Sequence, residues 1–395
     1  MAMGEIFTAP VEAIVSGGAG LARFEGRPVF IGLTAPGDMV RARIVREHSG
    51  WAEGEPAEII TPSPKRISPA CPLFGICGGC SLQHLAYEDQ LEAKAAILKD
   101  AFTRIGGLKT LPEPQIHPGP PWEYRNRVQF HRIIKGKYRI GFKSRKSEEL
   151  VPIPDCPIVD PGIRELLCAG DIIPPPDRDR FTLYSRGGLV LQEGRQIRGK
   201  VTISGRELTM DAGVFFQSNA LMQEALIKDL IKIAAQADNT RPMADIYCGV
   251  GAFAFFLQEM FKRIDLIEEN KTALALAREN VRGNENGYFA LTDDQWVKGP
   301  GQKAANHGFI VADPPRQGLS PAMRKWLSSL VAQKDTSGGV PSLAYVSCDP
   351  ATLARDSREL MAGGYELAEL HLYDFYPQTA HIESLALFRE KGADV

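Results

Sequence analysis

The stretch ADIYCGVGAFAFFL, residues 244–257, decides the fold of this chain. An apolar strand runs here directly into Gly249 and Gly251, and an apolar helix follows. Glycines in such a turn let the backbone approach a ligand, and the free N–H groups at the start of the helix can hold the polar part of that ligand. Glu268 ends the next apolar strand, where a carboxylate can accept hydrogen bonds from both hydroxyls of a ribose. The pattern predicts a nucleotide-type site, and by itself it fits NAD as well as S-adenosylmethionine.

The alternation of apolar strands with helices continues through the second half of the chain. The helical stretch LMQEALIKDLIKIAAQA comes first, and further strand-like segments are RIDLIE, HGFIVAD and SLAYVSC. Strands that alternate with helices indicate a mostly parallel sheet covered on both faces. We therefore expect residues 206–395 to form an α/β, Rossmann-like domain.

The first half of the chain is rich in short strands. Over residues 1–62, five segments of alternating polarity are broken by Gly and Pro turns, which predicts a small OB-like β-barrel. The run TPSPKRISPACP then looks like a linker, and apolar residues from His84 to Ile105 recur at helical spacing. Residues 122–198 again look strand-rich, so a central mixed α/β domain is expected over residues 63–205.

Composition narrows the class of protein. With 395 residues, 44% of them hydrophobic and 24% charged, the chain is long enough for two or three folded domains. A net charge of -2 lacks the basic excess of many nucleic-acid-binding proteins, so any basic surface must be local. Neither a signal-like N-terminus nor a membrane-length apolar run occurs, which predicts a cytoplasmic protein without a membrane partner. In such a protein the seven cysteines are expected to be reduced, metal-bound or catalytic.

The motif HGFIVADPPRQGL bears on the choice of ligand. Asp313 stands at the carboxyl end of a strand, where open sheets place their ligands, and Pro314 and Pro315 fix a rigid turn that exposes the carboxylate. Methyltransferases that act on bases or amino groups need such a turn here, whereas dinucleotide enzymes do not. The motif favours S-adenosylmethionine, with a strand that merely ends in Asp-Pro as the structural alternative.

Two further reactive groups follow the last strands. In SLAYVSCDPATLARD, Cys348 ends a strand and precedes a helix beginning near Pro350, and a thiol at a helix N-terminus is poised to ionise. A buried, inert cysteine is the alternative when the residue is viewed alone. His381 and Glu383 stand in a loop just before the apolar strand SLALF, so Glu383 is expected at the same ligand edge as Asp313 and Cys348.

These groups fit one reaction. Carbon 5 of uracil is a poor nucleophile, so a thiolate must first add to carbon 6 and turn carbon 5 into an enolate-like carbon that can attack a sulfonium methyl group. A base must then remove the proton from carbon 5 so that the thiol can leave. Cys348 would be the nucleophile and Glu383 the base. Asp313 could hydrogen-bond the uracil edge or lie near the methyl donor, and both roles stay open.

A second constellation of cysteines lies upstream, in ACPLFGICGGCSLQH. Cys71, Cys77 and Cys80 have five and then two residues between them, and Cys156 in PIPDCP could be a fourth ligand. Three closely spaced thiols among glycines with one distant thiol suit an iron-sulfur cluster better than zinc, which more often shows paired short spacings. The cysteine spacing of radical enzymes is absent from the sequence.

Residues 122–146, WEYRNRVQFHRIIKGKYRIGFKSRK, form a locally basic strip. Nine Lys or Arg stand against one Glu, with aromatic residues between them. Such a strip can contact phosphates while rings or guanidinium planes stack on unpaired bases. Arg125, Arg127 and Arg132 are the candidate RNA-binding residues, and an ordinary solvated face is the alternative.

Taken with these motifs, the chain resembles the RNA uridine-5-methyltransferase family, and within it the iron-sulfur members that begin with a TRAM domain. The resemblance runs from GGAGLARFEGRPVFIGLTAPGD through the cysteine cluster and YRNRVQF to FFQSNA, DIYCGVGAF, DPPRQGL, VSCDPATLARD and HIES. It implies a multidomain protein with a TRAM barrel, a central iron-sulfur domain and a methyltransferase domain, in which the helix near residues 84–110 can pack on the catalytic domain.

The resemblance also implies roles for individual residues. Cys348 would be the nucleophile and Glu383 the base, and four cysteines would hold a [4Fe-4S] cluster: Cys71, Cys77, Cys80 and Cys156. The residues expected around S-adenosyl-L-methionine are Gln217, Tyr247, Gly249, Gly251, Glu268, Asp313 and, in the adenine region, Asp293. Two positions depart from the family pattern, because Ala252 and Asp349 stand where the family usually has asparagine. Asp349 adds a negative charge that would oppose thiolate formation unless it is turned away.

The identity of the RNA is less constrained. Barrel-bearing members of the family mostly act on large-subunit ribosomal RNA, so 23S rRNA is the expected substrate, and the T loop of tRNA is the alternative. A non-catalytic RNA-binding or RNA-folding protein and an enzyme that methylates another base position are further alternatives. We expect a monomer.

Overall fold

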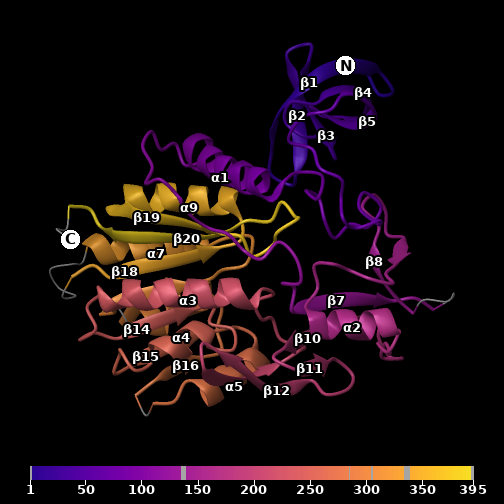
Figure 1. Cartoon of the computed structure of the whole chain (residues 1–395). Coiled ribbons are helices and arrows are strands. Elements are labelled where there is room, and N and C mark those ends of the chain that lie inside the picture. Colours follow the sequence, from indigo (N-terminus) through magenta and orange to yellow (C-terminus); the bar gives the residue numbers. More distant parts are fainter. Residues whose placement is uncertain (1, 135–138, 284, 304–305, 333–338, 393–395) are drawn as a thin grey trace.

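The computed structural model describes residues 2–134, 139–283, 285–303, 306–332 and 339–392 (Figure 1). A small barrel, a central sheet and a large α/β sheet follow one another along the chain. The barrel with the N-terminus stands off from the large sheet (Figure 1).

The N-terminal unit is a closed five-stranded barrel with the strand order β1-β2-β3-β5-β4. Its strands are β1 (Ile6–Ile14), β2 (Ala19–Phe24), β3 (Arg27–Gly32), β4 (Met39–Glu47) and β5 (Ala52–Thr61). Side chains alternate between exposed and buried along β1 and β4, and the buried set forms its own small core. The predicted barrel is confirmed.

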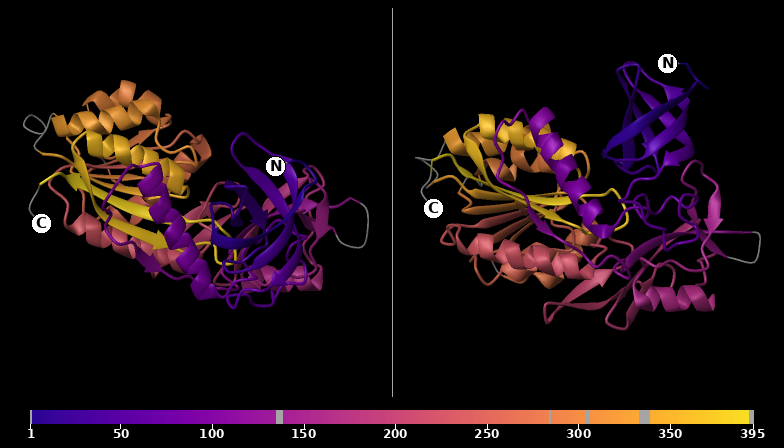
Figure 2. Two further views of the ribbon diagram at one scale, coloured as in Figure 1. Left: turned by 90° about the horizontal axis from the view of Figure 1, so that it is seen from above. Right: turned by 45° about the horizontal axis from the view of Figure 1, so that its top comes forward.

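Helix α1 (Tyr87–Arg104) and strand β6 (Gln115–His117) connect the barrel to the rest of the chain. Although they precede the central sheet in sequence, both pack on the large sheet. Apolar residues of α1 such as Leu98 and Phe102 are fully buried in the same core as Leu353 of helix α9 (Pro350–Ala362), and β6 pairs with the sheet edge in parallel. Figure 2 shows α1 running along the same side of the large sheet as α9.

The central unit contains a five-stranded sheet in the order β11-β10-β7-β8-β9. Its strands are β7 (Arg127–Arg132), β8 (Ile140–Lys143), β9 (Leu150–Pro152), β10 (Arg180–Arg186) and β11 (Leu189–Gln192), and helix α2 (Pro161–Ala169) packs on it. A separate hairpin of β12 (Arg198–Ile203) and β13 (Arg206–Asp211) follows. The predicted border at residues 205 and 206 falls in the turn of this hairpin.

The large sheet has eight strands in the order β16-β15-β14-β17-β18-β20-β19-β6. They include β14 (Met243–Ile246), β15 (Ile264–Ile267), β16 (Gly287–Phe289), β17 (Phe309–Ala312), β18 (Ser342–Ser347), β19 (Tyr365–Tyr373) and β20 (Glu383–Glu390). The strands from β16 to β18 are parallel, and β20 runs antiparallel between β18 and β19. Residues of β14, β15 and β17 are buried on both faces, as expected for parallel strands between helices.

Helices cover both faces of this sheet, which confirms the predicted α/β architecture. On one face lie α3 (Ala220–Ala235), α4 (Ala252–Leu257) and α5 (Lys271–Asn280). On the other lie α6 (Asp293–Lys298), α7 (Pro321–Ala332), α9 (Pro350–Ala362) and α1, with a short 3-10 turn at Pro300–Lys303. The strand order reverses between β14 and β17, and ligands bind at the carboxyl ends of strands at such a point.

Two global expectations can be compared with the described residues. None of their helices is long and apolar enough to cross a membrane. All seven cysteines are free thiols rather than disulfides.

Candidate active site

The predicted catalytic and donor-binding residues converge on one cavity at the carboxyl edge of the large sheet. The cavity has a volume of about 1070 Å³. Eight of the nine residues predicted from the sequence line it, namely Gln217, Tyr247, Gly249, Glu268, Asp293, Asp313, Cys348 and Glu383. Glu383 joins residues that end strands because β20 is antiparallel to β18, so that its first residues pair with the end of β18.

Gly251, the ninth residue, lies behind the glycine loop instead of in the cavity lining. It caps the N-terminus of α4 with a φ of 77°. An added Cβ would stand 3.1 Å from side-chain atoms of both Ala277 and Val281, and both distances are shorter than ordinary van der Waals contacts. Gly251 therefore lets the loop pack closely against α5, while Gly249 faces the cavity.

Tyr247 holds an unusual backbone conformation immediately before this loop. Its φ of 63° is in the left-handed region, which costs free energy for a residue with a side chain. Its hydroxyl donates a hydrogen bond of 2.6 Å to Asp293, whose same oxygen accepts the backbone N–H of Ser320 at 3.0 Å. Asp293 thus ties the glycine loop to the turn that follows Asp313.

Two acceptors that line the cavity, Gln217 and Glu268, suit a methyl donor with an amino group and a ribose. Glu268 accepts the N–H of Gly249 at 3.0 Å and thereby fixes the loop that it faces. Gln217 and Asp245 are 7% and 1% exposed, and each has a side-chain oxygen without a hydrogen-bond partner. Buried acceptors without partners are costly, so the oxygen of Gln217, which lines the cavity, is suited to accept an N–H or O–H group of S-adenosylmethionine.

Sequence reasoning missed Asp245. The carboxyl group accepts the N–H of Ala254 at 3.1 Å, and burial raises its pKa to about 7. The sequence does contain a signal for this residue, since an acidic residue inside an otherwise apolar strand is rarely buried without a partner or a function.

Asp313 and Glu383 are carboxyl groups close enough for the charge of one to oppose ionisation of the other. Asp313 is half-buried and Glu383 is 3% exposed. Burial raises the pKa of Asp313 to about 7. Burial also raises the pKa of Glu383 well above its usual value, and the charge of Asp313 raises it further. Two neighbouring carboxyl groups cannot readily ionise together, so the pair retains a proton near neutral pH before substrates bind.

Cys348 stands between β18 and α9, as predicted, but its thiol is not poised to ionise. Burial, together with the charges of Glu383 and Asp313, raises the pKa of Cys348 to about 12, and Arg316 acts in the opposite direction. The structure thus differs from the expectation drawn from the helix N-terminus, because desolvation and two acidic neighbours favour the protonated thiol in the protein alone.

Asp349, one of the two departures from the family pattern, is turned away from this thiol. It is the N-cap of α9, and its side chain accepts the backbone N–H of Thr352 at 2.9 Å. Capping satisfies one of the free N–H groups of the helix, and Asn and Asp serve this purpose equally well. Ala252, the other departure, is the first residue of α4, where the preceding Gly251 makes no side-chain cap.

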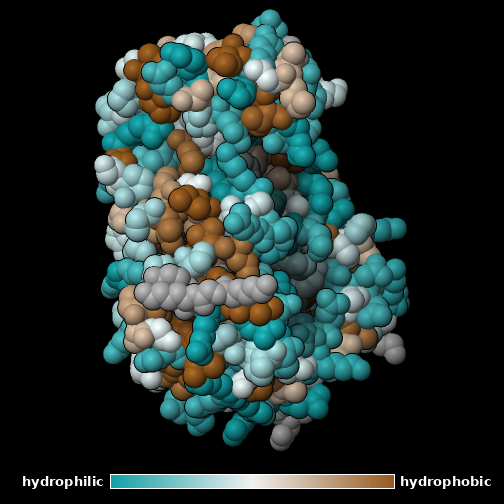
Figure 3. All heavy atoms as spheres, turned by 90° about the vertical axis from the view of Figure 1, so that its right-hand side faces the viewer, coloured by the Kyte–Doolittle hydropathy of each residue, from teal (hydrophilic) through white to brown (hydrophobic). Residues whose placement is uncertain are grey.

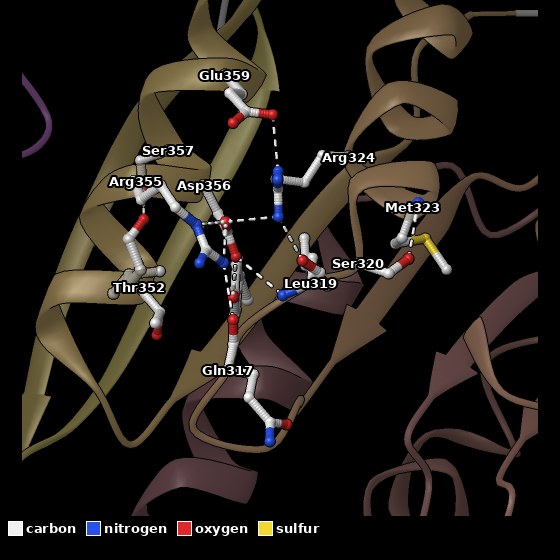
Figure 4. A network of polar contacts seen from close by, with 12 residues as sticks. Gln317, Leu319, Ser320, Met323, Arg324, Thr352, Arg355, Asp356, Ser357 and Glu359 are labelled. Atoms are coloured by element: carbon white, nitrogen blue, oxygen red, sulfur yellow. Dashed lines mark hydrogen bonds and ion pairs between the residues drawn. The ribbon is translucent and has the colours of Figure 1, made fainter. Parts of the chain in front are cut away.

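A buried ionic network holds the turn that follows Asp313 against α9 (Figure 4). Asp356 is fully buried and accepts the N–H of Leu319 at 2.9 Å and the Nε of Arg355 at 2.8 Å, and Arg324 lies 3.3 Å from it. A Cβ on Gly318 would come within 2.5 Å of Asp356, so only glycine fits there. Asp356 connects the DPPRQGL motif to the VSCDPATLARD motif, a role that the sequence alone did not reveal.

Three further residues line the reactive end of the cavity: Arg316, Tyr376 and His381. Arg316 donates to Nδ1 of His381 over 3.3 Å. Burial raises the pKa of Tyr376 to about 12, and the charge of Glu383 adds to the effect. The hydroxyl group of Tyr376 therefore stays protonated beside the two predicted catalytic residues.

The four cysteines predicted to hold a cluster line a second cavity of about 350 Å³. Cys71, Cys77 and Cys80 come from the loop after the barrel, and Cys156 follows β9. Burial, together with the neighbouring Cys80, raises the pKa of Cys156 to about 12. Four thiols from distant parts of the chain thus meet in one place. Gly78, Gly79 and Arg125 line both cavities, so the two sites adjoin.

The spacing of the sulfur atoms distinguishes between metal groups. Within the described ranges, one set of three Cys, His, Asp or Glu ligand atoms lies within 4.8 Å of one another, and it contains no cysteine. A tetrahedral zinc ion with bonds of about 2.3 Å brings its sulfur ligands to about 3.8 Å from one another. No three of the four thiols lie that close together in this structure.

That compact set, His117, Asp229 and His371, is already satisfied by protein groups. Asp229 accepts the Nζ of Lys232 at 2.6 Å and the hydroxyl of Tyr373 at 2.9 Å, and the two imidazoles are joined at 3.1 Å. Because Lys232 already binds the carboxylate of Asp229, we interpret these three residues as a structural network.

The predicted RNA-binding strip divides into two parts. Arg125 and Arg127 line the large cavity, and Arg127 lies over the exposed ring of Phe215 at 5.7 Å from its centroid. Arg132 is outside the cavity lining and pairs with Asp179 at 3.2 Å. Part of the strip, residues 135–138, lies outside the described residues. The side of the molecule with the barrel and the central sheet has a largely hydrophilic surface (Figure 3).

Two family models match the chain. The model described as tRNA (Uracil-5-)-methyltransferase matches residues 185–292 and 297–391. The TRAM domain model matches residues 3–57, which is the region of the barrel.

Relatives match over nearly the whole chain. An uncharacterized RNA methyltransferase of Treponema denticola is 34% identical, over 93% of this chain and 94% of its own length. A 23S rRNA (uracil(1939)-C(5))-methyltransferase of Alkalilimnicola ehrlichii is 30% identical, over 98% of each chain. Among solved structures, the Pyrococcus abyssi tRNA (uracil-54, C5)-methyltransferase in complex with S-adenosyl-L-homocysteine has the same fold, with a TM-score of 0.70, 22% identity and coverage of 97% of this chain and 100% of that chain.

Proposed function

Because the chain belongs to the tRNA (uracil-5-)-methyltransferase family, we propose that it transfers a methyl group from S-adenosylmethionine to carbon 5 of a uridine in RNA. One observation carries the assignment of the site. Cys348 and Glu383 open onto the same cavity as the donor-binding Gln217 and Glu268, so a thiol, a base and the place for the donor are within one enclosure.

Cys348 is the nucleophile. Its thiolate adds to carbon 6 of the uracil, and the electron pair of the carbon 5–carbon 6 double bond makes carbon 5 nucleophilic. Carbon 5 then takes the methyl group, and the broken bond leaves its electron pair on the donor sulfur. S-adenosylmethionine supplies the methyl group on a positively charged sulfur, and this charge favours ionisation of a thiol whose pKa is otherwise raised to about 12.

Glu383 is the base that ends the reaction. Its carboxylate removes the proton from carbon 5, the C–H pair restores the double bond, and the pair of the S–C6 bond returns to Cys348 as a thiolate. The carboxyl group of Asp313 decides when Glu383 carries a charge, since each one raises the cost of ionising the other. Asp313 lines the same cavity, where it would hydrogen-bond the uracil edge or lie near the methyl donor.

Donor binding falls to the groups around the glycine loop. The unpaired oxygen of Gln217 would accept a polar hydrogen of the donor, and Glu268 would accept the ribose hydroxyls. Asp293 acts by holding Tyr247, so it shapes the adenine region. Gly249, which has no side chain, would let the donor come close to the backbone of the loop.

Cys71, Cys77, Cys80 and Cys156 would hold a [4Fe-4S] cluster. Four thiols around one cavity, spaced too widely for a single zinc ion, support this assignment. The cluster would link the loop after the barrel to the central sheet and keep Arg125 at the border with the active site. Its role is structural, because the methyl transfer moves no net electron.

The substrate is RNA, and we propose 23S rRNA as the molecule modified. Relatives that cover nearly all of this chain, barrel included, carry that substrate in their names. The target uridine has to leave its stack to reach Cys348 in the cavity. Arg125 and Arg127 at the cavity and Arg132 on the adjoining surface would contact the RNA backbone. All these groups come from one chain, so a monomer suffices.

Two variants test the chemistry with S-adenosylmethionine labelled in its methyl group. Cys348→Ala should abolish transfer to RNA, since no other described thiol lines the cavity. Glu383→Gln should transfer the methyl group once and then remain covalently attached to the RNA, visible as a band stable in denaturing gels. Absence of that band would contradict the roles of both residues.

The RNA is identified by a separate measurement. Mapping 5-methyluridine in total RNA from cells with and without the protein should show loss of a site in 23S rRNA. Loss in the T loop of tRNA instead would assign the protein to the other substrate of its family.

A further inference from the structure

We propose that helix α1 positions the general base of the reaction, although it lies far from the catalytic domain in sequence. It does so by holding residues 374–382, the loop that joins β19 to β20 and ends at Glu383. This inference rests on the proposed function, because Glu383 is a base only in that reaction. The same loop carries Tyr376 and His381 into the cavity.

The backbone of the loop is fixed by hydrogen bonds along consecutive residues. Four consecutive carbonyl groups, residues 375–378, each accept a hydrogen bond from another part of the chain. The donors are Asn219 Nδ2 to Phe375 at 3.2 Å, Lys94 Nζ to Tyr376 at 3.0 Å, the Tyr124 hydroxyl to Pro377 at 2.8 Å, and the N–H groups of Ser81 and Leu82 to Gln378, both at 3.0 Å. Of these donors, only Asn219 belongs to the second half of the chain. A surface loop usually leaves such groups to water, so this loop has little freedom of its own.

The strongest contact from α1 is a buried ion pair. Nζ of Lys94 lies 2.6 Å from Oδ1 of Asp374, and both side chains are 0% exposed. Lys94 is also the donor to the carbonyl group of Tyr376, so one ammonium group holds the loop at two points. A charged pair without access to water is costly unless its geometry is well kept, which ties the position of the loop to that of the helix.

One turn earlier on α1, Gln90 binds the loop by a reciprocal amide pair. Its Nε2 donates to Oε1 of Gln378 at 3.0 Å, and its Oε1 accepts the backbone N–H of Gln378 at 2.9 Å. Gln378 has a φ of 68°, a strained value that persists only where the surroundings enforce it. The two amides are 1% and 3% exposed, so water does not replace these bonds.

These contacts bear on the base more than on the other catalytic groups. The backbone of Glu383 is anchored by its pairing with Tyr373, and its side chain, which is 3% exposed, lines the cavity together with Tyr376 and His381 of the loop. Cys348 depends on β18 and α9, and the turn of Asp313 depends on Asp356. Loosening the loop would therefore let water reach the carboxyl group of Glu383 and move it, while the nucleophile and the donor site stay in place.

The chemistry predicts a specific defect. Addition of Cys348 to carbon 6 and transfer of the methyl group precede the work of the base. If Glu383 is misplaced, the carbon 5 proton is not removed, the S–C6 bond does not break, and methylated RNA stays attached to the protein. Simple destabilisation would lower all steps together and trap no adduct.

The test uses the full chain with Gln90→Ala, which removes both amide bonds and leaves no unpaired charge. The control is Lys99→Met on the exposed side of α1, where the lysine is 42% exposed. In a single turnover with methyl-labelled donor and RNA, the Gln90 variant should transfer methyl groups within about twofold of the wild type and release RNA about tenfold more slowly, because a general base contributes at least that much. Denaturing gels should show the methylated adduct for this variant and not for the control.

A second variant covers the case in which Gln90→Ala does not fold. Lys94→Met combined with Asp374→Asn removes the ion pair without leaving a buried charge, and it should trap the same adduct. Release at the wild-type rate in either folded variant, or slow methyl transfer without an adduct, would overturn the inference. Failure of the proposed function looks different, because the wild type would then transfer no methyl group and Glu383→Gln would trap nothing.

Discussion

Replacing Asp313 by Asn should make the protein more stable at neutral pH and leave it unchanged in acid. Burial raises the pKa of Asp313 from its usual value of 3.8 to about 7 in the folded protein. A carboxyl group with a raised pKa binds protons more tightly when folded, so stability falls as the pH rises from its unfolded to its folded pKa. The loss begins at about pH 4 and is complete above about pH 7.

The size of the effect follows from the same two values. At about 1.4 kcal/mol per pKa unit, a rise from 3.8 to about 7 corresponds to roughly 4 kcal/mol. Asp313 is only half-buried and faces an open cavity, so we expect about half of this, roughly 2 kcal/mol, in Asp313→Asn above about pH 7. This gain corresponds to roughly 5 °C in the unfolding midpoint of the catalytic domain.

Thermal unfolding of wild type and variant between about pH 4.5 and pH 8 measures this difference. The control is Asp177→Asn, which removes a carboxylate whose side chain is 66% exposed. Equal stabilisation by Asp313→Asn at both ends of the pH range, or a variant less stable than the wild type at pH 8, would refute the reasoning. Methyl transfer by Asp313→Asn should be strongly reduced. The carboxylate of Asp313 lowers the stability of the fold, and such a cost is expected where the group is needed for activity.

Four other outcomes are expected. Asp349→Ala should lower stability by about 1 kcal/mol through loss of the α9 cap, while Asp349→Asn should be neutral within a few tenths, both measured by thermal unfolding. Asp356→Ala should cost about 3 kcal/mol by leaving two arginines without their buried partner, and calorimetry should show weaker binding of S-adenosylmethionine. Arg127→Ala should reduce the slope of log affinity for RNA against log salt by about 1, measured by fluorescence anisotropy. Cys156→Ser should lose iron and visible absorbance after anaerobic purification, whereas Cys168→Ser, at an exposed cysteine outside the cluster cavity, should keep both.

Much of the fold followed from local pattern. The barrel strands were predicted because alternation along β1 and β4 reports which face is buried, and the closed barrel confirms it. The parallel strands were predicted because short apolar runs alternate with helical periods. β6 was not predicted, since three residues with the pattern Gln-Ile-His carry no periodicity, and only pairing with β19 makes them a strand.

The candidate site also has features that the sequence predicted and features that it did not. The glycine loop, Asp313 and Cys348 were found from the sequence because each follows directly on an apolar strand, and parallel strands end at one edge. The state of the thiol was not found. Its pKa depends on Glu383 and on burial, and neither a neighbour from another strand nor the absence of water is visible in the residues beside Cys348.

The sequence by itself determined which groups of the catalytic edge meet, because a doubly wound sheet brings strand ends together wherever the strands lie in the chain. Only the tertiary structure decided how those groups are charged and what holds them. The pairs Lys94 with Asp374 and Gln90 with Gln378 join residues 280 and 288 positions apart. No local propensity encodes such contacts, since they arise only once hydrophobic packing has laid α1 against the catalytic sheet and removed the water between them.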